Sequence, residues 1–410
     1  MHRPSLVTLA ALAASAPAFA QTQNVRPPIA HYWISAETSA GMAGMSGMGA
    51  MMGRMMGAPS MEGGKRMLLQ LGSSQAAAGE PRAQHDIPPA LGMGPALPLL
   101  TPQAARPERG ERDLPEGMEK PKGRMLIYWG CGETARPGQP VVIDFAKVAQ
   151  GQAPAGLSSR RITMATSPAP GRNRTYGDWP NREDSRPVPA GGSLRGDHVV
   201  RGNYSPEIRF AVGERHDFME AVQLAPAQPT PGGAMKVQWR SVPTATGYFA
   251  TAMGASQREE VVFWSSAEVQ EMGGALMDYV PPAEVARLVR EKVVMPPQAT
   301  ECVVPVEVIK AAQAPFFNFI AYGDELNLVH PPRPSDPKQA WEQQWAVKVR
   351  LKSTASALLA EGMGGETRES RRGAAPEPQA GPQGAPQQDP QAPASPVDEG
   401  TRILRGILRF

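Results

Sequence analysis

Short stretches in which apolar and polar residues alternate are the most frequent pattern along the chain. The clearest runs from Trp345 to Lys352, where every second residue is apolar and the residues between are mostly cationic. Met235 to Arg240 and Glu207 to Val212 alternate in the same way. This period of two is typical of strands with one buried and one solvated face, as in antiparallel sheets. Further apolar runs have the length of a strand: 67–71, 125–129, 141–145, 261–264, 303–309 and 316–322.

Helix signals are fewer and local. Ser265 and Glu268 have the spacing of a capping box, and Gly273–Gly274 would end a helix of about two turns. A second helix is expected over 282–294, where Pro282 occupies the first turn and apolar residues recur on one face. Strands and helices do not alternate regularly, so the sequence disfavours a doubly wound nucleotide-binding sheet.

These patterns predict a mainly β fold of antiparallel β-sandwich-like domains, with one or two short helices and a disordered C-terminal tether. The chain has 44 prolines and 42 glycines but only 6% aromatic residues, which indicates long loops and linkers. The expected segments are a signal peptide at 1–20; an N-terminal β region at 21–115 with a Met- and Gly-rich loop at 41–63; a middle β region at 116–225; a β-sandwich-like domain at 226–355; a disordered linker at 356–400; and an amphipathic tail at 401–410.

The first 20 residues have the pattern of a secretory signal. A basic start is followed by the apolar run Leu6 to Ala14 and by Ala18-Phe19-Ala20, a small-x-small cleavage site. The mature chain is therefore expected to begin near Gln21 and to act in the periplasm or outside the cell. Beyond the signal, no apolar run approaches the roughly 18 residues that span a bilayer, so no transmembrane span is expected in the mature form.

The charge balance bears on the choice of partner. The formal net charge is +3, from 42 basic and 39 acidic residues, so the chain lacks the basic excess that neutralises phosphates. Nucleic acid is therefore not an expected partner.

The chain has two cysteines, Cys131 and Cys302. In an oxidising compartment an even pair is first interpreted as one disulfide, which would connect two regions far apart in sequence. The alternative is two free buried thiols, because spacing alone does not place the two Cα atoms within bonding range.

One segment carries a resemblance to a known family. Val237-Gln238-Trp239 followed by Ser241 to Tyr248 resembles the B-to-C strand region of bacterial fibronectin type III-like domains, over the stretch 235–265. The resemblance implies a sandwich and no binding residues. The expected helix at 282–294 and Cys302 have no place in that family's pattern. Tyr128 to Gly132 and His85 to Pro89 look like segments of uncharacterised exported proteobacterial proteins, which implies location only.

A Met-rich stretch is the first candidate binding site. Thioether sulfur is a soft ligand, and three or four such groups suit Cu(I). The stretch is similar to Met-rich inserts of bacterial copper-handling proteins. The alternative is a flexible Gly-rich loop in which Met supplies adaptable apolar surface. The methionines are Met42, Met45, Met48, Met51, Met52, Met55, Met56 and Met61.

Established catalytic motifs are missing from the sequence. It contains no His-Glu-x-x-His, Gly-x-Ser-x-Gly, Walker or Cys-x-x-Cys pattern. The pairs Asp197-His198 and His216-Asp217, with Glu214 and Glu220 nearby, could form a hydrolytic or metal site if their strands pair. Neighbours on a strand point to opposite faces, however, and ordinary surface or capping histidines are the alternative.

The C-terminal segment changes composition abruptly. Residues 361–400 are rich in Pro, Gln, Ala and Gly and contain no aromatic residue. Residues 402–410 then separate apolar and cationic positions with helical period. This end is expected to dock on another protein, on an anionic membrane surface or on its own domain. The docking residues would be Ile403, Leu404, Ile407 and Leu408.

The leading hypothesis is an exported, non-enzymatic binding or interaction protein of the cell envelope, or a secreted one, without a cofactor. The alternatives are a periplasmic Cu(I)-binding protein that uses the Met-rich loop and a hydrolase that uses the histidine–carboxylate pairs.

Overall fold

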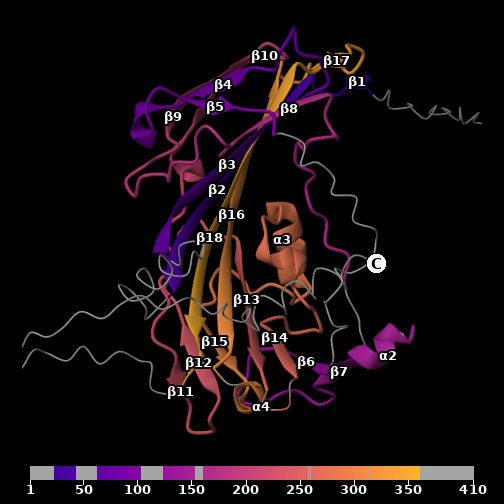
Figure 1. Ribbon diagram of the computed structural model, residues 1–410, viewed down its shortest axis with the longest axis vertical. Coiled ribbons are helices and arrows are strands. Elements are labelled where there is room, and N and C mark those ends of the chain that lie inside the picture. Colours follow the sequence, from indigo (N-terminus) through magenta and orange to yellow (C-terminus); the bar gives the residue numbers. More distant parts are fainter. Residues whose placement is uncertain are drawn as a thin grey trace, which may run out of the picture.

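A computed structural model describes residues 23–42, 62–102, 123–152, 160–256, 258, 260–312 and 314–360. The mainly β fold predicted from the sequence is confirmed. Figure 1 shows long strands that run most of the height of the molecule, with smaller sheets and short helices placed against them.

The largest element is a sheet of nine strands. β6 pairs with β14 and β18 with β2 in parallel, whereas the other neighbours run antiparallel. In order across the sheet the strands are β7 (Val141–Asp144), β6 (Arg124–Trp129), β14 (Val261–Ser265), β13 (Gly247–Ala255), β16 (Phe316–His330), β18 (Trp345–Leu358), β2 (Ala30–Met42), β3 (Glu62–Ser73) and β8 (Thr175–Trp179).

Two smaller sheets pack against one face of the nine-stranded sheet. One core cluster joins side chains of all three sheets, so this face is apolar along the length of the long strands. The four-stranded sheet has the order β10 (Ser205–Val212), β9 (Gly196–Gly202), β4 (Ala83–Asp86) and β5 (Ala96–Leu99). The three-stranded sheet has the order β11 (Gln228–Pro229), β12 (Met235–Gln238) and β15 (Glu301–Val304), and a separate parallel pair joins β1 (Val25–Arg26) to β17 (Trp341–Glu342).

The alternation in β18 decides which residues face this core. Trp345, Val347, Val349 and Leu351 are buried, whereas the residues between them are only partly buried. The strand predicted from the 345–352 pattern is therefore confirmed, with its apolar side toward the two small sheets and its cationic side on the opposite face.

The helix α3 (Pro282–Arg290) lies against that opposite face, beside the middle of the long strands. Val285 and Leu288 pack there in one cluster with Phe249 and Ile320 of the large sheet. The predicted helix at 282–294 is thus confirmed, but it ends earlier. At Lys292, φ is 59°, and the chain leaves the helix there.

Two local predictions are wrong. Ser265 is the last residue of β14, and its hydroxyl donates to the Glu271 carbonyl, so no helix forms over 265–273. The run 303–309 is not a single strand, because Pro305 separates β15 from α4 (Val306–Ala311). The remaining short elements are α2 (Phe145–Ala149), η1 (Pro89–Leu91), η2 (Glu214–His216) and η3 (Ala275–Met277).

The segments expected from the sequence share these sheets. The nine-stranded sheet takes strands from 21–115, 116–225 and 226–355 alike, and β4 and β5 pair in one sheet with β9 and β10. The stretch 235–265 is divided between two facing sheets, and its fibronectin-like character stays a prediction. No helix among the described residues is long and apolar enough to cross a membrane.

Candidate functional site

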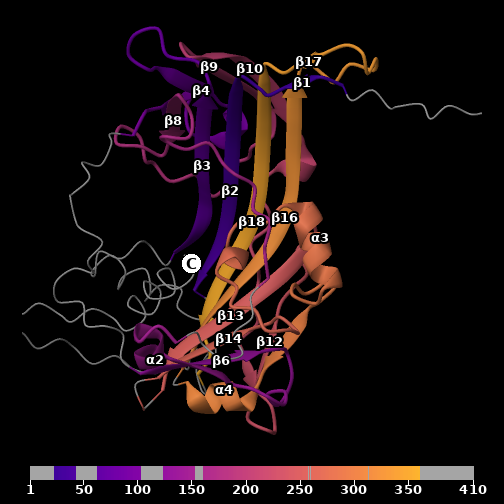
Figure 2. The same ribbon diagram turned by 90° about the vertical axis from the view of Figure 1, so that its right-hand side faces the viewer.

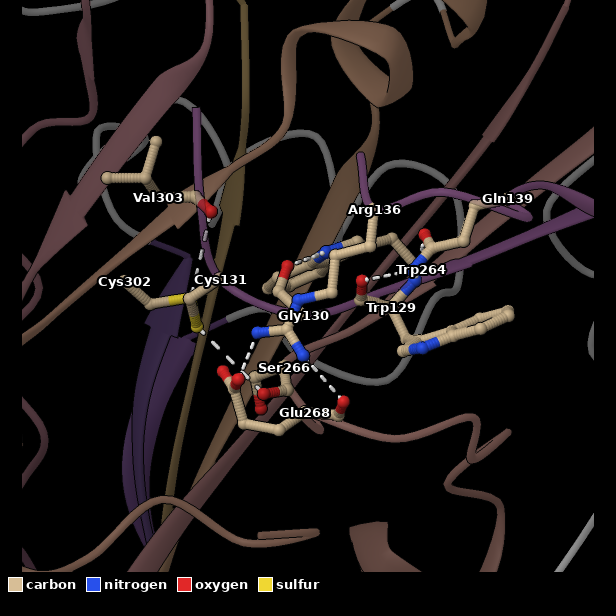
Figure 3. A network of polar contacts seen from close by, with 10 residues as sticks. All are labelled: Trp129, Gly130, Cys131, Arg136, Gln139, Trp264, Ser266, Glu268, Cys302 and Val303. Atoms are coloured by element: carbon tan, nitrogen blue, oxygen red, sulfur yellow. Dashed lines mark hydrogen bonds and ion pairs between the residues drawn. A yellow bond between two sulfur atoms is a disulfide. The ribbon is translucent and has the colours of Figure 1, made fainter. Parts of the chain in front are cut away.

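The predicted disulfide between Cys131 and Cys302 is present, with Cα atoms 5.3 Å apart. Cys131 follows β6 and Cys302 lies in β15, so the bond ties the three-stranded sheet to the large sheet. Figure 3 shows the polar contacts around it.

Residues beside the disulfide satisfy one another. Arg136 pairs with the Glu268 carboxylate and also donates to the Glu268 carbonyl at 2.7 Å. The indole of Trp264 donates to the Gly130 carbonyl at 2.9 Å, and Gln139 makes two hydrogen bonds with the backbone of Trp129 (Figure 3). The polar groups of the loop after β6 are thus occupied by hydrogen bonds and ion pairs that stabilise the loop conformation. We therefore assign this cluster a structural role.

The histidine of the Asp197-His198 pair has an unforeseen partner. His85 Nε2 lies 2.9 Å from His198 Nδ1, and both imidazoles are fully buried. The hydroxyl of Tyr32, on the large sheet, lies 2.8 Å from His85 Nδ1. At the other end, His198 Nε2 lies 2.7 Å from the Leu194 carbonyl oxygen.

The carbonyl fixes the direction of every hydrogen in this row, which we call the histidine chain (Tyr32, His85, His198 and the Leu194 carbonyl). A carbonyl only accepts, so His198 Nε2 donates to it and neutral His198 accepts at Nδ1. His85 must then donate from Nε2 and accept the Tyr32 hydroxyl at Nδ1. Burial, followed by the influence of His198, holds the pKa of His85 well below its usual value, and burial also lowers the pKa of His198.

His216 and Asp217 make no hydrogen bond to the imidazoles of the histidine chain, although Asp217, like His198, bonds to the backbone of Leu194. His216 Nε2 is 4.0 Å from the Asp324 carboxylate at the edge of the large sheet. Asp217 accepts from the Ser193 hydroxyl at 2.6 Å and from the Leu194 N–H at 2.7 Å. Glu214 and Glu220 are exposed.

No hydrogen bond or ion pair between described residues joins the side chains of the six predicted residues to one another. The side chain of Asp197 is exposed while that of His198 is buried, as expected for neighbours on a strand. Among the described residues, no group of three or more His, Cys, Asp or Glu side chains has an arrangement that could hold a metal ion.

Two predicted sites lie largely or wholly outside the described residues. Met42 ends β2 and pairs with Ser356, but Met45, Met48, Met51, Met52, Met55, Met56 and Met61 fall in 43–61, the connection between paired strands β2 and β3. The docking residues Ile403, Leu404, Ile407 and Leu408 are also outside the described part. Both sites stay predictions.

A row of cations and aromatic rings lies on the polar face of the large sheet. Lys348 Nζ is 5.5 Å and Arg350 Cζ 5.0 Å from the centre of the Trp33 ring. Arg350 Cζ is also 4.4 Å, and Lys352 Nζ 4.6 Å, from the centre of the Tyr279 ring. The order Lys348, Trp33, Arg350, Tyr279, Lys352 thus alternates cation and ring, and we call these five residues the cation–aromatic ladder.

The two lysines of the ladder have carboxylate partners. Lys348 pairs with Glu325 at 2.5 Å, and only 7% of the Glu325 side chain is exposed. Lys352 lies 3.6 Å from a Glu37 carboxylate oxygen and 3.7 Å from one of Asp278.

Arg350 differs from both lysines. Its Nε donates to the Ser35 hydroxyl at 2.7 Å, and no carboxylate of the described residues lies within ion-pair distance of it. Burial lowers the pKa of Arg350, and the electrostatic influence of Asp278, Tyr279 and Glu325 partly opposes this shift. Its guanidinium still carries its charge at neutral pH. Among the described residues, the terminal N–H groups of Arg350 have no hydrogen-bond acceptor or carboxylate partner.

The segment 160–174 crosses this face between α3 and β8 (Figure 2). At one end the Thr163 N–H donates to Glu284 of α3 at 2.8 Å, and at the other the Gln70 amide donates to the Pro168 carbonyl at 3.0 Å. The polar face is thus bounded by a fixed backbone segment.

The sequence indicated only part of the ladder. Alternation over 345–352 places Lys348, Arg350 and Lys352 on one face, whereas Trp33 and Tyr279 come from distant segments. In β2, the polar residues His31, Ser35 and Glu37 fall at every second or fourth position among apolar residues, and this was the available signal for the strand.

No protein-family model, curated protein or solved structure matches this chain.

Proposed function

We propose that this chain is an exported, non-enzymatic binding protein whose cation–aromatic ladder receives an anionic group of its ligand at Arg350. The observation that carries the proposal is the contrast within β18: both lysines have carboxylate partners, whereas the guanidinium between them has none.

The energetics favour an anion at this position. A partly buried charge without a counter-charge costs free energy, and a charge-assisted hydrogen bond to it contributes about 1.5–3 kcal/mol. The rings of Trp33 and Tyr279 hold the guanidinium in place, each contact contributing about 0.5–2 kcal/mol. A preorganised guanidinium suits a carboxylate or a phosphate, both of which accept two N–H groups at once.

Export supports the same proposal. The signal pattern at 1–20 and the Cys131–Cys302 disulfide agree with an oxidising compartment. The ligand would then be an acidic molecule that the protein meets outside the cytoplasm. A carboxylate probe and a phosphate probe distinguish the two candidate anionic groups.

Titration of the mature protein with polyglutamate and, separately, with polyphosphate tests the proposal by calorimetry. We expect one of the two to bind, and Arg350→Gln to weaken that binding by about 10- to 100-fold, the equivalent of one charge-assisted hydrogen bond. Arg333→Gln is the matched control, because Arg333 also lies over a tryptophan ring, that of Trp341 at 5.6 Å, but away from the ladder. Binding of neither polymer, or equal weakening by both substitutions, would refute the proposal.

A further inference from the structure

The histidine chain connects two sheets through a layer that is otherwise apolar. Tyr32 belongs to β2 of the large sheet, whereas His85 and His198 belong to β4 and β9 of the four-stranded sheet. Phe210 of β10 stacks on His198 with ring centres 4.8 Å apart. The Tyr32 hydroxyl and His85 thus make a polar contact between the sheets inside the shared core.

In the histidine chain, neither imidazole has a nitrogen with an unused lone pair that could bind an added proton. His85 Nδ1 already receives the Tyr32 hydroxyl, and His198 Nδ1 already receives the His85 N–H. Protonation of His85 Nδ1 would force the Tyr32 hydroxyl to turn and accept instead, which leaves its own hydrogen without an acceptor among the described residues. Protonation of His198 Nδ1 would meet the hydrogen on His85 Nε2. Either protonation would also create a charge in a site where both imidazoles are fully buried.

The surrounding charged and titratable groups do not compensate for that charge. Burial raises the pKa of both Tyr32 and Tyr204, so neither phenol supplies a negative charge. Asp197 acts on His198 from the exposed side of β9, and Asp217 holds the N–H rather than the carbonyl of Leu194. No carboxylate of the described part of the chain is a hydrogen-bond partner of either imidazole.

We infer that the histidine chain is an acid-sensitive lock: it holds the four-stranded sheet on the large sheet at neutral pH and releases it when a histidine takes up a proton. In the released state, water solvates the imidazolium, so its charge is no longer buried and its N–H groups find acceptors. The lock is independent of the proposed function, because Tyr32 faces the core while Trp33 and Arg350 lie on the opposite face.

Release should be local because the four-stranded sheet has limited backbone connection to the rest. Leu100, after β5, exchanges two backbone hydrogen bonds with Asp178 of β8, at 3.1 and 2.9 Å. Near the end of β10, Arg215 pairs with Asp324 of the large sheet at 2.7 Å. Asp178 lies in the edge strand β8, and Asp324 lies in β16 beyond its pairing with β13, so neither contact has to hold for β13 and β16 to stay paired.

The pH range follows from the folded and unfolded states. Both histidines have a folded pKa below the unfolded value of about 6.5, so the locked state keeps its full stability above that pH. Below it, the open state takes up protons that the locked state does not. The equilibrium then shifts toward opening by up to about tenfold per pH unit for each histidine.

Hydrogen exchange of the mature protein at about pH 7.5 and about pH 5.5 tests the lock. After correction for the intrinsic rate, we expect the protection of β4 and β9 amides to fall at least about tenfold, while β13 and β16 keep theirs. His31→Gln, in the same strand as Tyr32 but on its other face, should leave this response unchanged. The double variant His85→Gln with His198→Asn, whose amides cannot take up the proton, should remove it.

Equal loss of protection in all sheets, or an undiminished response in the double variant, would overturn the lock. If the double variant does not fold, imidazole NMR of the unaltered protein decides. Reversible protonation of His85 or His198 while β4 and β9 remain protected would show that the locked state accepts the proton, and the inference would be wrong.

Discussion

Gly130 shows how one residue fixes the loop beside the disulfide. Its φ is 96°, in the left-handed region, and a Cβ placed there would lie 3.2 Å from Nε of Arg136. That guanidinium is held by Glu268 and has little room to move. The loop therefore needs glycine for both its backbone conformation and its packing.

Gly130→Ala should lower the free energy of unfolding by about 1–2 kcal/mol from the backbone alone, and by more if Arg136 is displaced. Gly138→Ala is the control, because its φ is 87° but nothing lies within 4 Å of the added Cβ. Urea unfolding of both variants measures the difference. Equal losses would mean that the Arg136 contact contributes nothing.

The histidines mark the limit of sequence reasoning at the scale of residues. The sequence predicted that Asp197 and His198, as neighbours on a strand, would point to opposite faces, and their side chains do so. The actual partner of His198, His85, comes from a strand paired with β9, and register across strands cannot be derived from one segment. The same applies to Trp33 and Tyr279, which meet Arg350 only through the assembled sheet.

At the scale of elements, alternation was a reliable guide and capping signals were not. The 345–352 pattern located β18 because one side of the strand packs on two sheets. The capping signal at Ser265 failed because the hydroxyl bonds to the Glu271 carbonyl while the backbone of Ser265 pairs with β13. Pairing with β13 thus prevailed over the local helix signal. The local sequence does not reveal this pairing, because its partner strand lies elsewhere in the chain.

The end of α3 offers a test at this scale. The Val293 N–H bonds to the Leu288 carbonyl and the Lys292 N–H to the Val289 carbonyl, which together form a Schellman motif. Lys292 occupies its left-handed position at φ 59°, where glycine is the favoured residue.

Lys292→Gly should therefore raise the free energy of unfolding, by about 0.5–1 kcal/mol, because glycine adopts this conformation without strain. Lys310→Gly, inside α4, should lower it, since glycine there loses helix propensity of about 1 kcal/mol. Thermal and urea unfolding would check both signs. A loss of stability in Lys292→Gly would contradict the assignment of the motif.

For the whole molecule, the disulfide joins parts that the sheets connect only indirectly. It closes a sequence separation of 171 residues between the loop after β6 and β15. Replacing both cysteines by serine should cost about 2–5 kcal/mol of unfolding free energy, largely by enlarging the unfolded ensemble. Urea unfolding without reductant measures this loss. Adding reductant should destabilise the unaltered protein to a similar extent and leave the serine variant unchanged; a response of the variant would point to another cause.

The parallel pairing of β18 with β2 sets the order in which the sheet can be completed. β2 forms a hairpin-like pair with β3 early in the chain, but its other neighbour comes from the far end, as the Arg350–Ser35 contact across 315 positions illustrates. Until Trp345 and the residues after it have emerged, one edge of the β2–β3 pair has no partner, and its apolar face has no complete core. Contacts between such distant positions make folding slow. This strand order therefore delays closure of the sheet until β18 has been synthesised, and until then the β2–β3 pair must be kept from pairing with other chains at its open edge.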